Sequence, residues 1–244
     1  DAMGFVVLTW LMTHEENAAA IAALVADLHE INPSTAHLSD PGAFDEADLP
    51  TSPNHTFRTT CNMAFGRFAW SVRCHDGVRE AFALLHGVPA AELACSWDNP
   101  FYTPRADATT NAQATQLHWD NNHYFRGEQA PMAEELCVQG VYHAAPTSAR
   151  TPSFVCCPGS HRHWRGLCEE STNPSKQGAA VLNYLPASAL GADALAAHGV
   201  QPPVQIHVPE RSLLLWDSRV CHGNTSPTVD ATASAATSGG GFAG

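Results

Sequence analysis

Apolar and polar positions at the start of the chain predict one strand followed by one helix. Residues 4–8 are a short apolar run, as expected of a strand. Thr13 and Glu16 have the spacing of a capping box, which marks a helix start. The apolar residues that follow fall on one helical face, namely Ile21, Leu24, Val25 and Leu28. Pro33 then ends the pattern, so we expect a helix between these two limits.

A second helix and a second strand are predicted before the middle of the chain. Over 77–86, apolar residues share one helical face, and Gly87 has the place of a C-terminal cap. The run over 93–97 also indicates a strand. The stretches 32–56 and 98–115 are rich in Pro, Thr, Asp and other turn residues, so we expect irregular loops there.

Strand patterns dominate the second half. Apolar or alternating runs predict strands at 136–142, 153–157, 204–208 and 212–216. The last of these is apolar throughout, which is typical of a central strand, and a helix is expected over about 187–197. Helices first and then strands without βαβ alternation predict a mainly β sandwich or barrel with flanking helices.

The domain organisation follows from these patterns and from length. The 244 residues suffice for one large domain, which we place at 1–229, with a helical part over about 1–92 and a β core over about 93–229. Residues 230–244 are almost entirely Ala, Ser, Thr and Gly, so we expect a disordered tail.

Charge and hydropathy restrict the partners. The formal net charge of −12 disfavours nucleic acid and anionic membranes as partners. The densest basic stretch, 161–165, is expected to be a solvated loop. There is no apolar run near the length of a membrane span and no signal-peptide pattern, so we expect a cytoplasmic protein. No pattern indicates an oligomeric state.

Eight cysteines are scattered along the chain, and none form a CxxC pair. This spacing argues against a zinc ribbon or a thioredoxin-type redox site. Several cysteines sit in apolar runs, as at Cys156 and Cys157. We therefore expect small buried hydrophobes in a reducing compartment rather than a disulfide framework.

The candidate chemistry lies in two short segments, His118-Trp119-Asp120 and the stretch from Trp216 to Asn224 that contains His222. Residues i and i+2 point to the same face of a strand, whereas on a helix they diverge by roughly 200°. His118 and Asp120 can therefore chelate one ion from a strand. With His222 they supply the 2-His-1-carboxylate set that binds non-heme Fe(II). HxD alone often occurs by chance, so the surrounding sequence has to show whether these residues form a metal site.

That context resembles the phytanoyl-CoA dioxygenase-like family of Fe(II)/2-oxoglutarate oxygenases. The resemblance spans about residues 4–227 and follows the family's order of motifs. These are the opening GFVVL before a helix, HWD at 118–120, CVQG at 137–140, PGSH at 158–161, and LLLWDSR running into His222-Gly223-Asn224.

The resemblance implies a double-stranded β-helix, or jelly-roll, core of cupin-like type, with His118, Asp120 and His222 as iron ligands. It also implies O2 and 2-oxoglutarate as cosubstrates, ascorbate as an accessory reductant, and hydroxylation of a small organic substrate through a ferryl species. Family halogenases carry a small residue in place of the carboxylate, so Asp120 favours hydroxylation. Gln139 and Asn224 lie where family members often place polar contacts to 2-oxoglutarate. Trp119, between the ligands, is expected to face away from them and pack.

One departure concerns the far carboxylate of 2-oxoglutarate, which the family binds with an Arg about ten residues after the distal His. Residues 230–235 contain no Arg or Lys, and we expect the last core strand, which would carry that Arg, to be missing. Two explanations stay open: the chain is truncated or mis-spliced after Pro227, or another group binds the carboxylate. Arg219 and Arg211 are the nearest cations, and Arg219 is assigned as the candidate contact although its position also suits a structural role.

Two other functions are consistent with parts of the pattern. The missing Arg would suit a non-catalytic jelly-roll relative that keeps its metal, and the intact ligand set weighs against it. A cupin-type enzyme that uses no 2-oxoglutarate is the other, and the PGSH and DSR segments weigh against that one. The acidic chain, with 12 Lys and Arg, argues against a CoA thioester substrate.

Overall fold

The computed structural model describes most of the chain before residue 225. The described residues are 2–44, 48, 58–59, 63–96, 98, 100–102, 115–120, 137–148, 151, 153–171, 184–187 and 190–224. For 58–59, 101–102, 115–116, 120, 168–171 and 184–186 the description covers the backbone alone. The predicted tail over 230–244 and most of the predicted loop over 98–115 lie outside these residues.

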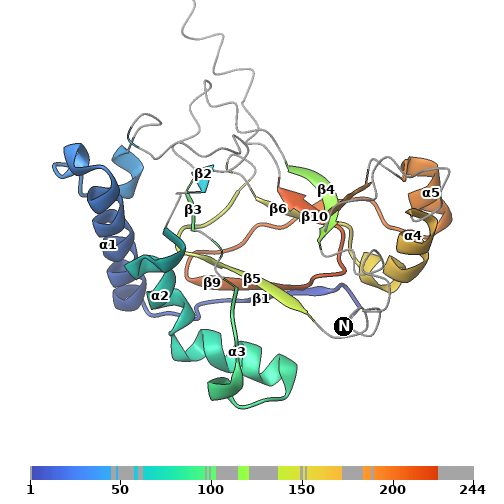
Figure 1. The fold of residues 1–244 in the computed structure, drawn as a ribbon, viewed down its shortest axis with the longest axis horizontal. Coiled ribbons are helices and arrows are strands. Elements are labelled where there is room, and N and C mark those ends of the chain that lie inside the picture. The colour runs from blue at the N-terminus through green and yellow to red at the C-terminus, as the bar shows by residue number, and fades with distance from the viewer. Residues whose placement is uncertain are drawn as a thin grey trace, which may run out of the picture.

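Helices come first and strands dominate later, as predicted (Figure 1). The helices are α1 His14–Ile31, α2 Arg67–Arg73, α3 Asp76–His86, α4 Trp164–Ser171 and α5 Ala192–Ala197. The strands are β1 Phe5–Leu8, β2 Arg58–Thr59, β3 Phe101–Tyr102, β4 Thr115–Asp120, β5 Val138–His143, β6 Phe154–Cys156, β7 Tyr184–Pro186, β8 Val204–Gln205, β9 Ser212–Asp217 and β10 His222–Asn224. Single 3-10 turns include η1 Pro33–Thr35, η2 Pro41–Ala43, η4 Met63–Phe65, η5 Ala90–Glu92 and η7 Ser160–Arg162.

The strands form antiparallel sheets that lie one above the other in the centre of Figure 1. One sheet has the order β1-β9-β5, and the other has the order β7-β4-β10-β6-β8. A short pair, β2-β3, stands apart from both. Core residues from both larger sheets pack together, among them Phe154 and Cys156 from one and Leu214 and Trp216 from the other. The molecule is therefore built from antiparallel sheets with helices beside them.

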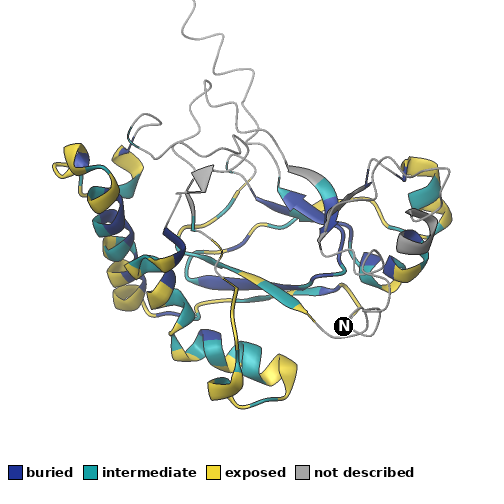
Figure 2. Ribbon diagram, viewed as in Figure 1, coloured by how far each residue is buried: buried dark blue, intermediate teal, exposed yellow. Residues whose placement is uncertain are grey.

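Strand β9 is the centre of its sheet, as its wholly apolar pattern predicted. It pairs with β1 on one side and with β5 on the other. Alternation divides its side chains, so that Leu214 and Trp216 face the second sheet while Leu213 and Leu215 face the helices. Both faces are covered, which explains why β9 is among the darkest segments in Figure 2.

The two predicted helices form where their end motifs place them. Thr13 caps α1, accepting a hydrogen bond from the backbone N–H of Glu16, whose carboxylate accepts one from Thr13 N–H in return. Gly87 ends α3 in the left-handed conformation, with φ 65°. Both predictions are confirmed, because capping depends on residues close in sequence.

The helices cover the outer faces of the sheets. Phe82 of α3 and Val72 of α2 pack on Leu213 and Leu215 of β9. Gly140 of β5 makes this approach possible, since a Cβ there would lie 2.9 Å from Phe82 and 2.8 Å from Leu215. Helix α1 joins α2 through buried Asp27, which accepts hydrogen bonds from Arg67 and the backbone of Phe68.

Four sequence predictions are corrected. No strand forms over 93–96, the described part of the run 93–97, because Ala94, Cys95 and Ser96 are exposed and meet no sheet. The basic stretch 161–165 is a turn and the start of α4 rather than a solvated loop, since Trp164 is buried. The helix expected over 187–197 begins only at Ala192, and the strand expected over 204–208 is limited to Val204–Gln205.

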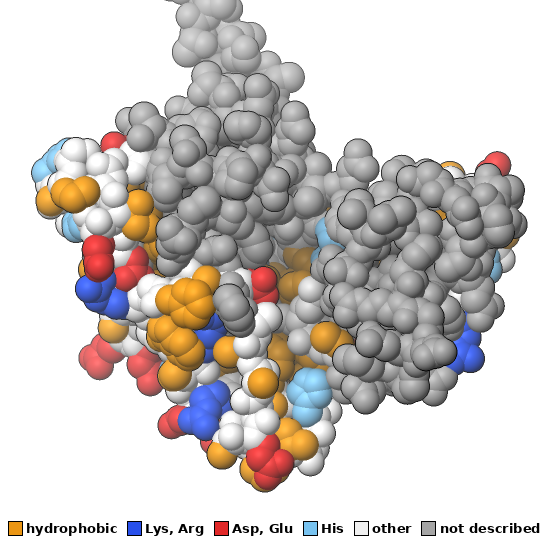
Figure 3. Space-filling model, viewed as in Figure 1, with side chains coloured by type: hydrophobic (Ala, Val, Ile, Leu, Met, Phe, Trp, Pro, Cys, Tyr) orange, Lys and Arg blue, Asp and Glu red, His pale blue; other side chains and the backbone are white. Residues whose placement is uncertain are grey.

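Several exposed apolar side chains gather around α2 and α3. Phe65 and Trp70 are about half-exposed, Leu84 almost fully so, and the guanidinium of Arg73 lies 5.6 Å from the Trp70 ring. Hydrophobic atoms are conspicuous over this part of the face drawn in Figure 3. Within the described residues, no helix combines the length and the apolarity needed to cross a bilayer.

Gly4→Ala should destabilise the protein by at least about 2 kcal/mol. Gly4 has φ 82°, which an L side chain rarely adopts, and an added Cβ would lie 2.5 Å from Val220 and 2.5 Å from His161. Gly87→Ala is the matched control, because Gly87 has φ 65° but open space around it. Urea unfolding should show the larger loss for Gly4→Ala, and equal losses would contradict a tight packing role for Gly4.

His143→Gln should flatten the pH dependence of stability between about pH 6.5 and 4. Burial lowers the pKa of His143 from 6.5 to about 4. Above pH 6.5 the ring is neutral in both the folded and the unfolded state, so it does not change the free energy of unfolding. Below pH 6.5 the unfolded chain binds a proton at His143, whereas burial keeps the ring neutral in the folded protein. Stability therefore falls as the pH drops, by about 3 kcal/mol at pH 4.

The measurement is the free energy of unfolding of wild type and variant at several pH values. Exposed His37→Gln is the control, and it should keep the wild-type slope. A variant with the wild-type slope at position 143 would show that His143 does not titrate in this way.

Candidate metal centre

The pairing of β10 with β4 brings two histidines together across 104 positions of sequence. His118 and His222 are direct partners in this antiparallel pair. Their ring centroids lie 4.6 Å apart, with an angle of 49° between the planes. Two imidazoles at this separation on one sheet face can converge on a single ion. The structure thus joins the two segments that the sequence singled out.

The tautomer of His222 is set by its neighbour Val220. The Nδ1 of His222 lies 3.0 Å from the carbonyl oxygen of Val220, which can only accept, so Nδ1 carries the proton. The lone pair of the ring is then on Nε2. A metal-bound histidine usually donates its other ring N–H in this way, which fixes its orientation and raises its basicity.

Aromatic side chains wall the histidine pair. The ring of Trp216 lies 5.2 Å from the ring of His222, and the ring of Phe154 lies 5.7 Å from it and nearly parallel. His118 is 8% exposed and His222 is 6% exposed. The pair therefore sits in a shielded, largely apolar environment, in which a bound ion would have little competition from water.

Asp120 is the third expected ligand. Its backbone lies in β4, paired with Tyr184 of β7, two residues along the strand from His118. The HxD motif therefore lies on a strand, and alternation along a strand puts its first and third residues on one face. The Asp120 side chain lies outside the described part of the chain, and the described side chains contain no group of three candidate ligands. The role of Asp120 as a ligand stays a prediction.

The loop between β9 and β10 is held by Asp217 and Arg219. The Arg219 guanidinium donates to both carboxylate oxygens of Asp217, at 2.8 and 2.6 Å, and its backbone N–H adds a third bond at 2.9 Å. Burial alone would raise the pKa of Asp217, but the bonds and charge of Arg219 outweigh it and lower that pKa. This closed pair is the structural role that the sequence allowed for Arg219. Its contact with 2-oxoglutarate stays a prediction.

The N-terminal segment and the PGSH turn hold the same loop from outside. The backbone N–H of Asp217 donates to the carbonyl of Gly4, and that of Cys221 donates to the buried hydroxyl of Ser160. Gly159 begins the turn with φ 75°. Residues adjoining β1, β6 and β9 thereby fix the course of the chain from β9 into β10, which begins at His222.

Gln139 and Asn224 both occupy core strands. Gln139 of β5 lies opposite Trp216 of β9, on the face that looks toward the second sheet. Asn224 of β10 lies opposite Phe154, two residues beyond His222, where the register with β4 shifts. Both lie within the β core that carries the histidine pair, and their contacts with 2-oxoglutarate stay predictions.

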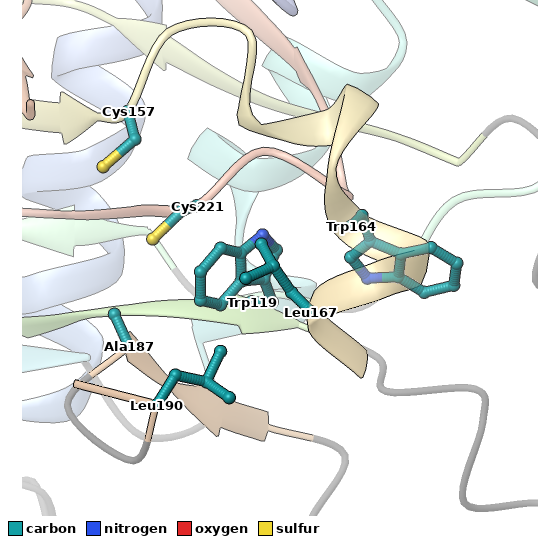
Figure 4. Packing of buried hydrophobic residues seen from close by; sticks show 7 residues of the cluster. All are labelled: Trp119, Cys157, Trp164, Leu167, Ala187, Leu190 and Cys221. Atoms are coloured by element: carbon teal, nitrogen blue, oxygen red, sulfur yellow. The ribbon is translucent and has the colours of Figure 1, made fainter. Parts of the chain in front are cut away.

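Trp119 faces away from the histidines and packs behind the five-stranded sheet, as expected. It is fully buried beside Cys221, and α4 covers it with Trp164 and Leu167 (Figure 4). Ala187 and Leu190 close the same cluster. This packing anchors the strand that carries His118.

The cysteines divide into two groups. Cys156, Cys157 and Cys221 are buried near the histidine pair, whereas Cys74, Cys95 and Cys137 are exposed. Burial raises the pKa of Cys156 to about 12, so its thiol stays protonated and is a poor metal ligand. The expected buried hydrophobic role thus holds for three of the six described thiols. Cys61 and the side chain of Cys168 lie outside the description.

A surface cavity of about 570 Å³ lies away from the histidine pair. Met3, Gly159, Arg162 and Val204 are among the residues that line it, and neither His118 nor His222 does. The chemistry of the histidine pair and the open hollow on the outer surface are therefore separate features.

Sequence reasoning also missed Phe154, Trp216 and the Val220 carbonyl as neighbours of His222, because only strand pairing places them there.

Comparisons with known proteins support the fold. No family model matches the chain, and no curated protein matches its sequence. Among solved structures, the epimerase SnoN in complex with Fe3+, alpha ketoglutarate and nogalamycin RO aligns with a TM-score of 0.52 at 10% identity, over 94% of this chain and 75% of that one. SnoN from nogalamycin biosynthesis also aligns in a second crystal structure (TM-score 0.49, 12% identity, 94% and 72%). EctD from S. alaskensis with 2-oxoglutarate and 5-hydroxyectoine aligns with a TM-score of 0.46 at 14% identity, over 94% of this chain and 68% of that one. At these identities the likeness concerns the fold, which this chain shares with SnoN.

Proposed function

We propose that this chain is a non-heme Fe(II)- and 2-oxoglutarate-dependent oxygenase that acts on a small organic molecule. The observation that carries the proposal is the juxtaposition of His118 and His222, with the proton of His222 held on Nδ1. The order of motifs supports membership of the phytanoyl-CoA dioxygenase-like family, and the two antiparallel sheets support a jelly-roll core.

The residues fit an iron ion. Two imidazole nitrogens and the carboxylate of Asp120, on the same strand as His118, make the donor set that Fe(II) takes in the 2-His-1-carboxylate sites. The open coordination positions of such an ion would bind 2-oxoglutarate and activate O2 toward a C–H bond of the substrate. SnoN is described as an alpha ketoglutarate-dependent epimerase, so the shared fold serves outcomes besides hydroxylation. Asp120 favours hydroxylation here.

The chain's own groups bind, orient and exclude water. Val220 orients the His222 ring through its carbonyl, and the Asp217–Arg219 pair stiffens the loop before it. Phe154 and Trp216 shield the histidines from solvent. We assign Gln139, Asn224 and Arg219 as candidate contacts to 2-oxoglutarate. The net charge of −12 disfavours nucleic acid as a partner.

His118→Ala and His222→Ala should each weaken metal binding by more than about 100-fold, because each removes one ligand. Mutating a residue that only hydrogen-bonds to a metal ligand already lowers metal affinity by about 10–100-fold. The measurement is the affinity for Mn(II), a stable stand-in for Fe(II), by calorimetry on the metal-free chain. Asp120→Ala should behave in the same way. Exposed His207→Ala is the control and should bind as wild type does.

The assay for the reaction is succinate formation from 2-oxoglutarate with Fe(II), ascorbate and O2. Wild type should form succinate slowly even without its substrate, and both histidine variants should form none. Tight Mn(II) binding that survives His118→Ala and His222→Ala would sink the metal assignment. Metal binding without any succinate would leave the site but refute the oxygenase activity.

A further inference from the structure

Trp216 occupies the inner face of its sheet, between the two larger sheets. Its neighbours across the strands are Phe5 of β1 and Gln139 of β5. It shares an apolar cluster with Phe154 and Cys156 of the second sheet. Its ring lies 5.2 Å from that of His222. Trp216 therefore reaches from one sheet to the proposed ligand on the other.

The indole N–H of Trp216 is a buried donor without an acceptor. The side chain is 7% exposed, and the Nε1 atom has no hydrogen-bond partner among the described residues. Indole nitrogen can only donate, and a buried donor left unpaired is costly, so folded proteins usually provide it with a partner. An acceptor supplied by a bound molecule would meet this requirement.

A lone unpaired indole does not identify a site. Trp119 also has a buried Nε1 without a partner, yet it packs in the apolar cluster behind the sheet, beside Leu167 and Cys221. The difference at Trp216 is position. Trp216 contacts a proposed metal ligand on the inner face, where a ligand of the ion would bind, whereas Trp119 lies on the opposite face of its strand.

We propose that Trp216 Nε1–H donates a hydrogen bond to a carboxylate oxygen of the molecule bound beside His118 and His222. This inference rests on the proposed function and gives it a carboxylate contact within the core. Gln139, directly across from Trp216, presents an amide to the same region. The acceptor is either the keto-acid end of 2-oxoglutarate or its far carboxylate.

Trp216→Phe tests the proposal, since it keeps an aromatic ring and removes the N–H. The matched control is Trp164→Phe, a Trp buried to 4% exposure in the cluster behind the other sheet. Calorimetry would give the affinity for Mn(II) alone, then for 2-oxoglutarate with Mn(II) present, and then for 2-oxobutyrate, which lacks the far carboxylate. Thermal unfolding would report whether each variant is folded.

Trp216→Phe should weaken 2-oxoglutarate binding by about tenfold and leave the affinity for Mn(II) alone within about twofold. The control should change neither. A similar loss for 2-oxobutyrate would assign the bond to the keto-acid end, and an unchanged value would assign it to the far carboxylate. An unchanged affinity for 2-oxoglutarate in Trp216→Phe overturns the proposal, as does an equal loss in the control or an equal loss of Mn(II) affinity.

A measurement on wild type covers the case in which Trp216→Phe fails to fold. With diamagnetic Zn(II) bound, the indole N–H resonance of Trp216, assigned through its contacts with Phe154 and His222, should move downfield when 2-oxoglutarate is added. A resonance that does not move overturns the inference. Wild type that binds neither Mn(II) nor 2-oxoglutarate overturns the proposed function as well, so the two failures are distinguishable.

Discussion

The pairing of β10 with β4 is the constraint on which the candidate site depends. It sets His222 opposite His118, and it holds β10 between β4 and β6 so that neither histidine can move without breaking ladder hydrogen bonds. A metal site needs its donors fixed before the ion arrives, because ordering them afterwards would cost conformational entropy. Short strand β10 meets this need because both of its edges are paired.

That pairing is in turn held by packing on both sides of the sheet. Trp119 fastens β4 to α4 from behind, while Trp216 and Phe154 fill the inner side against His222. The loop that delivers His222 is closed by the Asp217–Arg219 pair and by the backbone of Gly4. The N-terminal segment therefore belongs to the support of the site, although it contributes no expected ligand.

Local patterns predicted local structure well. The capping box at Thr13, the left-handed Gly87 and the apolar strand at β9 were all confirmed, since each depends on residues within one element. The strand expected over 93–97 failed, because a suitable run becomes a strand only where a sheet offers it an edge. Helix α4 was missed because the basic residues from His161 onward indicated a solvated loop, although Trp164 and Leu167 are buried.

By itself the sequence determined which residues could bind a metal and that HxD must lie on a strand, because side-chain alternation follows from two neighbouring positions. Only the tertiary structure decided that His222 meets His118, since their approach depends on hydrogen bonds between strands far apart in the chain. It likewise decided that Arg219 pairs with Asp217 and that Trp216 lies against His222. Such contacts arise from sheet register and packing, which no local pattern encodes.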